Sequence, residues 1–164
     1  GLLFLPYLSG ERTPHADPNA RGSFIGLTTR HTRGHLTRAV LEGVAYSMRD
    51  SRVIFEELDV PVNEIRVTGG GAKSELWRTI LAGVMGQSVH EINSGQGPAL
   101  GVALLAAAGA GEFRDVREAC KAVVKTVRKT EAEDGAARVY DAAFPVYQSL
   151  YRSLKTDFRQ IAAL

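Results

Sequence analysis

The sequence predicts an α/β fold in which parallel strands are joined by helical crossovers. Two short segments with the character of strands, residues 65–68 and 89–92, are each followed by a helical segment, and an amphipathic helical segment at residues 35–58 precedes both. This order of elements predicts parallel strands in a layered structure. The 164 residues are 45% hydrophobic, which allows one sizeable core, so we expect a single domain.

Composition and charge exclude several classes of partner. The formal net charge is +2, and Lys and Arg are interleaved with Asp and Glu, so nucleic acid is not an expected partner. The sequence has no signal-peptide pattern and no apolar run of about 18 residues, so we expect no membrane association. A lone cysteine, Cys120, cannot form an intrachain disulfide, and a cytoplasmic location fits best.

The first residues predict a strand and a long loop. The chain begins without Met on an apolar run at residues 2–5, which is typical of a buried strand, so we expect a fragment whose missing N-terminal part covers it. Residues 6–21 are rich in Pro, Gly, Ser, Asp and Asn and form a loop. Ordered loops of this length are commonly functional, and we favour that over disorder because residues 11–15 gather polar groups. A short strand is expected at residues 23–27.

The middle of the chain predicts a helix, a strand and a second helix. Apolar residues recur three and four apart over residues 35–58, the pattern of an amphipathic helix. The β-branched strand at residues 65–68 ends in three glycines, residues 69–71. A helix over residues 74–84 follows, and Gly86 is expected to end it.

A strand at residues 89–92 comes next, and residues 95–98 lead into a helix at residues 99–108 that has no charged residue. We expect this helix to be buried against the sheet, with Gly101 allowing close approach of backbones. The last third predicts two polar helices, at about residues 115–126 and 135–164. Pro145 interrupts the second, so a kink or two abutting helices are expected there.

The strongest local signal for chemistry is the strand that ends in Gly69-Gly70-Gly71-Ala72-Lys73-Ser74 and enters a helix. Glycines let a ligand approach the backbone, and the free N–H groups at the start of a helix favour an anion such as phosphate. The spacing matches neither the dinucleotide nor the P-loop pattern, so the motif alone is weak. A plain connecting turn with Ser74 as the helix N-cap is an equal alternative.

Other candidate residues have simpler explanations. Trp77 could flank an adenine, but a core position is the better interpretation, and Lys73 could contact a phosphate but is more simply solvated. The four histidines show no zinc-ligand spacing, and Cys120 is expected to be an inert, half-buried thiol. Glu11 and Asp17 could be imagined as an acid–base pair, but we expect solvated loop charges.

Taken together, several segments resemble the FGGY family of carbohydrate kinases, and its xylulokinases in particular. The resemblance includes Glu11-Arg12-Thr13-Pro14-His15 and covers residues 2–111 well and the tail loosely. Its specificity lies in the combination of motifs. The matching segments are residues 4–15 and 19–28, residues 22–42 as the family's second signature, residues 68–77 as its adenosine motif, and residues 97–101 as the start of the next helix.

The resemblance implies a domain fragment of the actin-like, ribonuclease-H-like ATPases, with a mixed sheet that contains parallel strands and is packed by helices. In that family two similar domains close on a cleft, and the C-terminal one mainly holds ATP. Residues 1–164 are then expected to be a partial C-terminal nucleotide-binding domain. The N-terminal sugar domain and the first strands of this domain would be missing.

The resemblance also implies roles for single residues. Gly69, Gly70 and Gly71 would lie against the α-phosphate and ribose of ATP, and Ala72 and Ser74 would lie near the adenosine.

Arg12, Gly26 and Thr28 would help to shape the cleft. Two family elements are absent, the Asp that deprotonates the sugar and a Gly-Thr turn near the β- and γ-phosphates. No catalytic residue and no protein-built metal site is therefore expected in this fragment, which alone should be inactive.

For the full-length enzyme the resemblance implies ATP and Mg²⁺ as cofactors and transfer of the γ-phosphoryl group to D-xylulose, giving D-xylulose 5-phosphate. Another ketose, a polyol or a sugar acid stays an open alternative, as does a non-catalytic nucleotide-binding module or a purely structural α/β domain. An unpaired strand edge would allow self-association, so a homo-oligomer is a further expectation.

Overall fold

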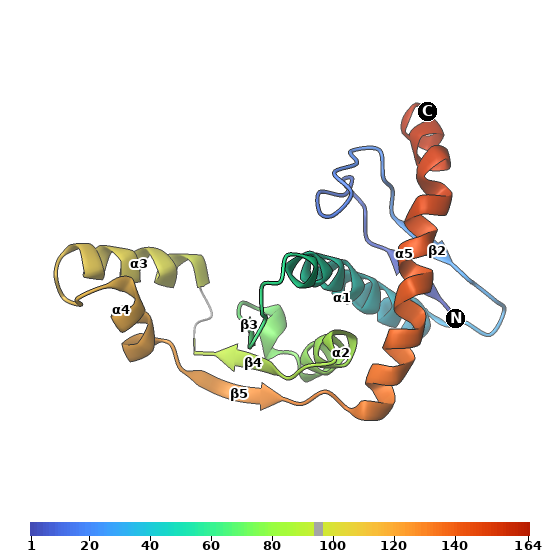
Figure 1. Ribbon diagram of the computed structural model, residues 1–164. Helices are drawn as coiled ribbons and strands as arrows, with labels where there is room; N and C mark the ends of the chain where they lie inside the picture. The colour runs from blue at the N-terminus through green and yellow to red at the C-terminus, as the bar shows by residue number, and fades with distance from the viewer. Residues whose placement is uncertain (94–96) are drawn as a thin grey trace.

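The computed structural model describes residues 1–93 and 97–164 (Figure 1). In chain order its elements are β1 (Leu3–Leu5), β2 (Ser23–Ile25), α1 (Arg33–Glu57), β3 (Ile65–Val67), the short 3₁₀ helix η1 (Gly71–Lys73), α2 (Glu75–Met85), β4 (Val89–Ile92), α3 (Gly97–Gly109), α4 (Val116–Val123), β5 (Thr126–Thr130) and α5 (Asp134–Ala162). Every strand and helix expected from the sequence is present, with ends within about three residues of those predicted.

The strands form two small sheets. In the first, β1 pairs antiparallel with β2, and Phe4 lies opposite Phe24. The second has the order β3-β4-β5. Its β3 and β4 are parallel, with Arg66 opposite His90, because η1 and α2 form the crossover between them, whereas β5 runs antiparallel to β4. The predicted mixed sheet with parallel strands is confirmed.

The main core lies where α1, α2 and α5 meet, with β1 and β4 at its edges (Figure 1). Most of its aromatic side chains come from α1 and α5, where Tyr46 lies 5.1 Å from Tyr147 between ring centroids. The buried residues of this cluster are Leu5, Tyr7, Ala20, Ala45, Tyr46, Ile80, Leu81, Ala82, Val84, Val89, Tyr140, Phe144, Tyr147, Tyr151 and Phe158.

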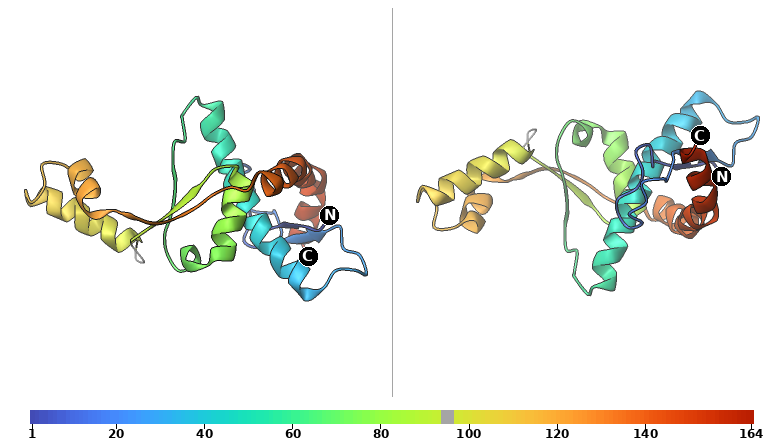
Figure 2. Two further views of the ribbon diagram at one scale, coloured as in Figure 1. Left: turned by 90° about the horizontal axis from the view of Figure 1, so that it is seen from below. Right: turned by 90° about the horizontal axis from the view of Figure 1, so that it is seen from above.

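The predicted burial of the uncharged helix α3 against the sheet is wrong. Among the described residues of α3 only Leu104 is buried, and α3 packs on α4 in an arm that extends away from the rest of the molecule (Figure 2). Gly101 has open space around it and brings no backbone close. Apolar residues on every side of a helix predict burial without saying which element covers it. Residues 95 and 96 of the expected lead-in lie outside the described residues.

Two features of the last third differ from the prediction. Residues 126–130 form β5, which the sequence did not indicate because its charged, mostly exposed residues lack the apolar alternation of a half-buried strand. α5 is one continuous helix that contains Pro145, so the alternative of two abutting helices is wrong. Within the described ranges, no helix is both long and apolar enough to cross a membrane.

Candidate functional site

The glycine turn, residues 69–74, joins the end of β3 to the start of α2. Gly69 has a φ of +86°, a conformation that side chains disfavour, which explains a glycine at this position. Ser74 is the N-cap of α2, and its side-chain oxygen accepts a hydrogen bond from the Trp77 backbone N–H at 3.3 Å. The structure therefore places Gly69, Gly70, Gly71, Ala72 and Ser74 together on one turn at the positive end of a helix.

The outer side of this turn is open. A Cβ atom added to Gly69 or Gly70 would meet no atom within 4 Å. Ala72, in contrast, is only 3% exposed, so it offers a ligand little surface. A ligand can thus approach the backbone of residues 69 and 70 directly.

Two hollows flank the glycine turn. One, of about 200 Å³, lies at the carboxyl ends of the parallel strands β3 and β4 and includes Lys73, Glu91 and Asn93. The other, of about 290 Å³, is mostly apolar and includes Gly71 and Trp77. Trp77 is half-buried against the main core, which confirms its core position while leaving one part of it in this hollow.

A buried arginine, Arg78, supports the glycine turn from beneath. It is 2% exposed, and its Nη1 donates to the Ala72 carbonyl oxygen at 2.5 Å while its Nε donates to Thr130 Oγ1 at 3.2 Å. Its Nη1 also lies 3.5 Å from Glu91 Oε2, which Arg128 approaches to 3.4 Å. Arg78 therefore fixes η1 against β4 and β5, and the two arginines neutralise the one carboxylate of the smaller hollow.

Sequence reasoning missed Arg78, although a signal for it was present. It stands between the inward-facing residues Trp77 and Ile80 on an otherwise apolar helix face, where an arginine needs buried partners. Lys73, in contrast, is exposed as expected and forms no ion pair with any residue that the structure describes.

The loop of residues 6–22 is ordered by two carboxylates. Glu11 accepts hydrogen bonds from the backbone N–H groups of Thr13 and His15, both at 2.7 Å. Asp17 is 6% exposed and accepts from the Asn19 N–H and the Tyr151 hydroxyl, both at 2.9 Å. The prediction of solvated loop charges is therefore wrong for Asp17, because local backbone donors and a distant tyrosine enclose it.

The residues expected to shape the cleft are not gathered at the glycine turn. Arg12 is exposed in the loop of residues 6–22. Gly26 has a φ of +92°, and a Cβ there would collide with the Gly1 carbonyl, so this glycine is needed for packing. The Thr28 N–H donates to His31 Nδ1 at 2.8 Å. The loop of residues 6–22 that carries Arg12 and the segment after β2 that carries Gly26 and Thr28 adjoin β1 and β2 in the chain, apart from the turn after β3 (Figure 1).

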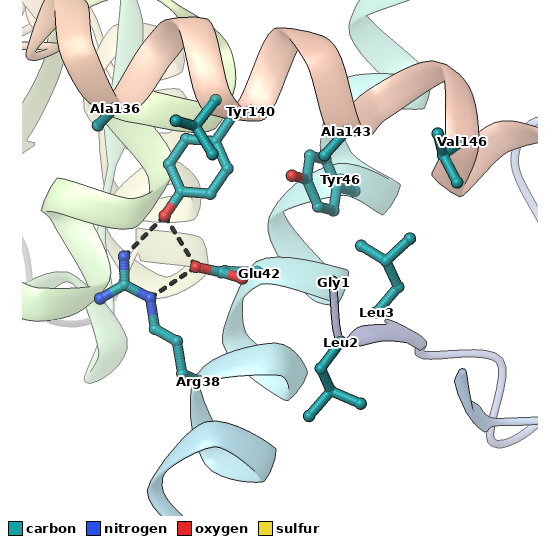
Figure 3. A pocket seen from close by; sticks show the side chains of 11 residues that line it. Gly1, Leu2, Leu3, Arg38, Glu42, Tyr46, Ala136, Tyr140, Ala143 and Val146 are labelled. Atoms are coloured by element: carbon teal, nitrogen blue, oxygen red, sulfur yellow. Dashed lines mark hydrogen bonds and ion pairs between the residues drawn. The ribbon is translucent and has the colours of Figure 1, made fainter. Parts of the chain in front are cut away.

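A larger hollow of about 460 Å³ lies between the N-terminal residues, α1 and α5 (Figure 3). Three of its polar side chains bond one another. Tyr140 Oη receives a hydrogen bond from Arg38 Nη2 at 2.7 Å and donates to Glu42 Oε1 at 2.9 Å, while Arg38 Nε contacts the same carboxylate oxygen at 2.7 Å. None of the predicted site residues lines this hollow.

No group of three or more His, Cys, Asp or Glu side chains in residues 1–93 and 97–164 is placed to hold a metal ion. Cys120 is a free, half-buried thiol, as expected.

Comparison with known proteins decides the family. Residues 1–110 match the C-terminal domain of the FGGY family of carbohydrate kinases. This chain belongs to that family. The FGGY match covers the loop with Arg12, the β2–α1 segment and the glycine turn, the same segments that carried the resemblance in the sequence.

Similar FGGY kinases include a xylulose kinase of Staphylococcus epidermidis, which is 39% identical over 155 residues, covering 94% of this chain and 31% of that protein. A gluconokinase of Bacillus subtilis is 37% identical over 163 residues, covering 99% of this chain and 32% of that protein. This chain therefore spans about a third of the length of the curated relatives that it matches.

Among solved structures, the xylulose kinase from Rhodospirillum rubrum superposes with a TM-score of 0.83 at 34% identity, covering 97% of this chain and 32% of that one. This similarity confirms the predicted actin-like α/β fold.

Proposed function

We propose that this chain is the ATP-binding part of a sugar kinase, a partial C-terminal nucleotide-binding domain. The observation that carries the proposal is the open glycine turn at the start of α2, in a member of a carbohydrate kinase family. Backbone N–H groups at the first turn of a helix lack partners within the helix and favour anions.

The turn is suited to holding the α-phosphate and ribose of ATP. No side chain of residues 69 or 70 stands between a ligand and the backbone, and Arg78 holds the Ala72 carbonyl so that the turn is fixed before a ligand arrives. A preformed site binds more tightly because less conformational entropy is lost on binding. Ser74 is already engaged as the N-cap, so its contribution to the adenosine contact would be limited to its remaining hydrogen-bonding capacity.

The reaction of the whole kinase is in-line phosphoryl transfer. The bond between the γ-phosphorus and the bridging oxygen of ATP breaks, a new bond forms to a sugar hydroxyl oxygen, ADP leaves, and the hydroxyl proton passes to a carboxylate base outside this chain. Mg²⁺ would neutralise charge on the phosphates, which supply its ligands. We expect the 164-residue chain alone to bind nucleotide without catalysing transfer.

The proposed sugar is D-xylulose, converted to D-xylulose 5-phosphate. The similarity to xylulose kinases supports this substrate. A sugar acid is the second candidate, because the similarity to a gluconokinase extends over 99% of this chain. Another ketose or a polyol stays a further alternative, since the sugar would be selected mainly by residues outside this chain.

A non-catalytic nucleotide-binding module is the alternative from another class. A cytoplasmic location and a homo-oligomer stay predictions. For the oligomer, sedimentation velocity over a range of protein concentrations is the direct measurement.

Calorimetric titration with ADP and with ATP in Mg²⁺ buffer tests the nucleotide site, and Gly70→Val is the informative variant. Gly70 has a φ of −61° and open space around it, so valine fits the fold but occupies the path of the ligand. We expect saturable binding by the unaltered chain and at least a tenfold weaker binding by Gly70→Val, which corresponds to about 1.4 kcal/mol. Gly69 is unsuitable because its positive φ would strain any replacement.

Gly135→Val on α5 is the matched control, because Gly135 is also exposed and a Cβ there meets no atom within 4 Å. It should bind nucleotide as the unaltered chain does. Binding that is equally strong in Gly70→Val would overturn the assignment of the site. An absence of binding by a folded, unaltered chain would contradict the proposal that this chain alone holds ATP.

A further inference from the structure

The tip of the long loop, residues 11–17, is closed on itself and carries an exposed arginine. The backbone N–H of Glu11 donates to the Asp17 carbonyl at 2.9 Å, and the N–H of Asp17 donates to the Glu11 carbonyl at 2.7 Å. The Glu11 carboxylate holds the backbone between them through Thr13 and His15. Arg12 stands on this loop tip, where its carbonyl accepts from the Ala16 N–H at 3.2 Å, and its guanidinium forms no hydrogen bond or ion pair with any residue in the described ranges.

The loop tip rests on the C-terminal half of α5 through one tyrosine. The ring of His15 stacks on the ring of Tyr151, with centroids 3.5 Å apart and planes 4° from parallel. The Tyr151 hydroxyl donates to Asp17 Oδ2 at 2.9 Å. A single buried side chain therefore contacts two residues of the loop tip, His15 through its face and Asp17 through its hydroxyl.

A second tyrosine layer supports this contact from the core. The Tyr7 hydroxyl lies 3.2 Å from the Tyr147 hydroxyl, and the Tyr7 ring meets the edges of both His15 and Tyr151. Tyr147 and Tyr151 are one helical turn apart, so α5 presents both to the loop. Tyr151 is 4% exposed and Tyr147 is fully buried, which leaves the pair little freedom to move.

We infer that Tyr151 is the positioning residue of the loop tip and that α5, which follows the residues 1–110 matched by the family's C-terminal domain, sets where Arg12 is presented. The inference rests on the proposed kinase function and on the expectation from the family resemblance that Arg12 helps to shape the cleft. Tyr151 does not itself reach the reacting atoms. It contacts His15 and Asp17 after Arg12, and Asp17 pairs through its backbone with Glu11 before Arg12, so the guanidinium is offered from a preformed loop.

The pKa shifts of His15 and Asp17, the two residues that Tyr151 contacts, agree with this role. Burial lowers the pKa of His15 below its ordinary value, Lys155 and Arg152 act in the same direction, and Glu11 and Asp17 oppose them. The Asn19 N–H and the Tyr151 hydroxyl lower the pKa of Asp17, as do Lys155 and Arg159. A neutral His15 and an ionised Asp17 are therefore the forms that fit the stacked arrangement at neutral pH.

Nuclear magnetic resonance of the labelled 164-residue chain tests the inference with three variants of α5. Tyr151→Phe keeps the ring and removes the hydroxyl, whereas Tyr151→Leu removes both. Tyr140→Phe is the control, because it removes a hydroxyl from the same helix that bonds Arg38 and Glu42 and not the loop tip. The readouts are the ring-current shift and pKa of His15 and the amide exchange rates of residues 13, 15 and 17.

Tyr151→Phe should keep the upfield shift of His15 and speed amide exchange at the loop tip by about tenfold, the effect of one hydrogen bond to a charged group. Tyr151→Leu should abolish the shift, return the His15 pKa towards its ordinary value and speed exchange further. Tyr140→Phe should change none of these readouts.

The inference is overturned if Tyr151→Phe leaves loop-tip exchange unchanged, or if Tyr140→Phe accelerates it as much. Should Tyr151→Leu fail to fold, Tyr151→Phe alone decides. No nucleotide enters the measurement, so a failure of the proposed ATP site would leave its outcome unaffected, and Gly70→Val should show the loop-tip exchange of the unaltered chain.

Discussion

Asp50 on α1 is a buried carboxylate with only one of its oxygens bonded. The residue is 3% exposed, its Oδ1 accepts a hydrogen bond from Gln148 Nε2 at 2.9 Å, and its Oδ2 has no hydrogen-bond partner among residues 1–93 and 97–164. Burial raises the pKa of Asp50 above its ordinary value of 3.8. The ionised form is thus disfavoured in the folded protein.

Asp50→Asn should therefore stabilise the protein at pH 7, by about 1 kcal/mol in the free energy of unfolding. The folded state binds the Asp50 proton more tightly than the unfolded state, so stability falls as pH rises from 3.8 towards the raised pKa, and the loss is complete above it. The gain from asparagine should vanish near pH 3. Urea unfolding at both pH values measures this, with the exposed Asp157→Asn as control.

A gain from Asp50→Asn that is equally large at pH 3 would contradict the role of the charge.

The pKa of Asp17 is shifted in the opposite direction, downward, because this carboxylate accepts hydrogen bonds. The sequence indicated neither the burial nor the pKa shift of either aspartate. Burial of Asp17 depends on Tyr151, 134 positions away, and burial of Asp50 depends on Gln148, 98 positions away. Local sequence patterns carry no information on partners at such distances.

At the scale of single elements, α1 is held against β1 through a glycine. Gly43 is buried in the middle of this helix, and a Cβ there would collide with the Phe4 carbonyl oxygen. Gly101 in the middle of α3 has open space around it. The two positions share the same helical backbone and differ in whether another element touches them.

Gly43→Ala and Gly101→Ala should therefore have opposite effects on stability. Alanine favours the helix by about 0.8–1.0 kcal/mol over glycine, so Gly101→Ala should stabilise α3 by up to that amount. Gly43→Ala forces α1 away from β1, and we expect a net loss of about 1–3 kcal/mol. Thermal unfolding of both variants measures the difference, and a stabilised Gly43→Ala would refute the close packing of these two elements.

Elements with a clear hydrophobic periodicity or a clear cap residue were predictable from the sequence. Elements that depend only on partners distant in the sequence were not. The stripe of α1, the N-cap Ser74 of α2 and the left-handed Gly86 at its end follow from local physical rules. The strand β5 could not be predicted, because pairing with β4 and not an apolar alternation makes it a strand. The place of α3 was also unpredictable, since its sequence is apolar on every side.

The candidate site divides in the same way. The glycine turn was predictable because glycines, a strand end and a helix start are adjacent in sequence. Arg78, which holds the turn, was not predicted, since its partners Glu91 and Thr130 come from two later strands.

For the molecule as a whole, Arg78 joins η1, β4 and β5 around one guanidinium. Arg78→Met removes a buried partner of Glu91 and of the Ala72 carbonyl, and we expect a loss of about 3 kcal/mol in the free energy of unfolding. Arg114→Met is the control, because Arg114 is 84% exposed and its ion pair with Asp115 should contribute less than about 1 kcal/mol. Chemical denaturation measures both variants, and equal effects would contradict a special role for Arg78.

The position of α5 at the end of the described chain also affects the order in which the elements fold. This helix packs on α2 and contacts β1, and the hydroxyls of its Tyr147 and Tyr151 meet partners in the loop of residues 6–22 that are 140 and 134 positions away in the chain. It is the last described element to leave the ribosome. The main core can therefore form only after this segment has been synthesised. Until then, the aromatic residues of the earlier elements stay exposed. Such long-range closure predicts slow folding through intermediates whose exposed apolar surface is prone to aggregation.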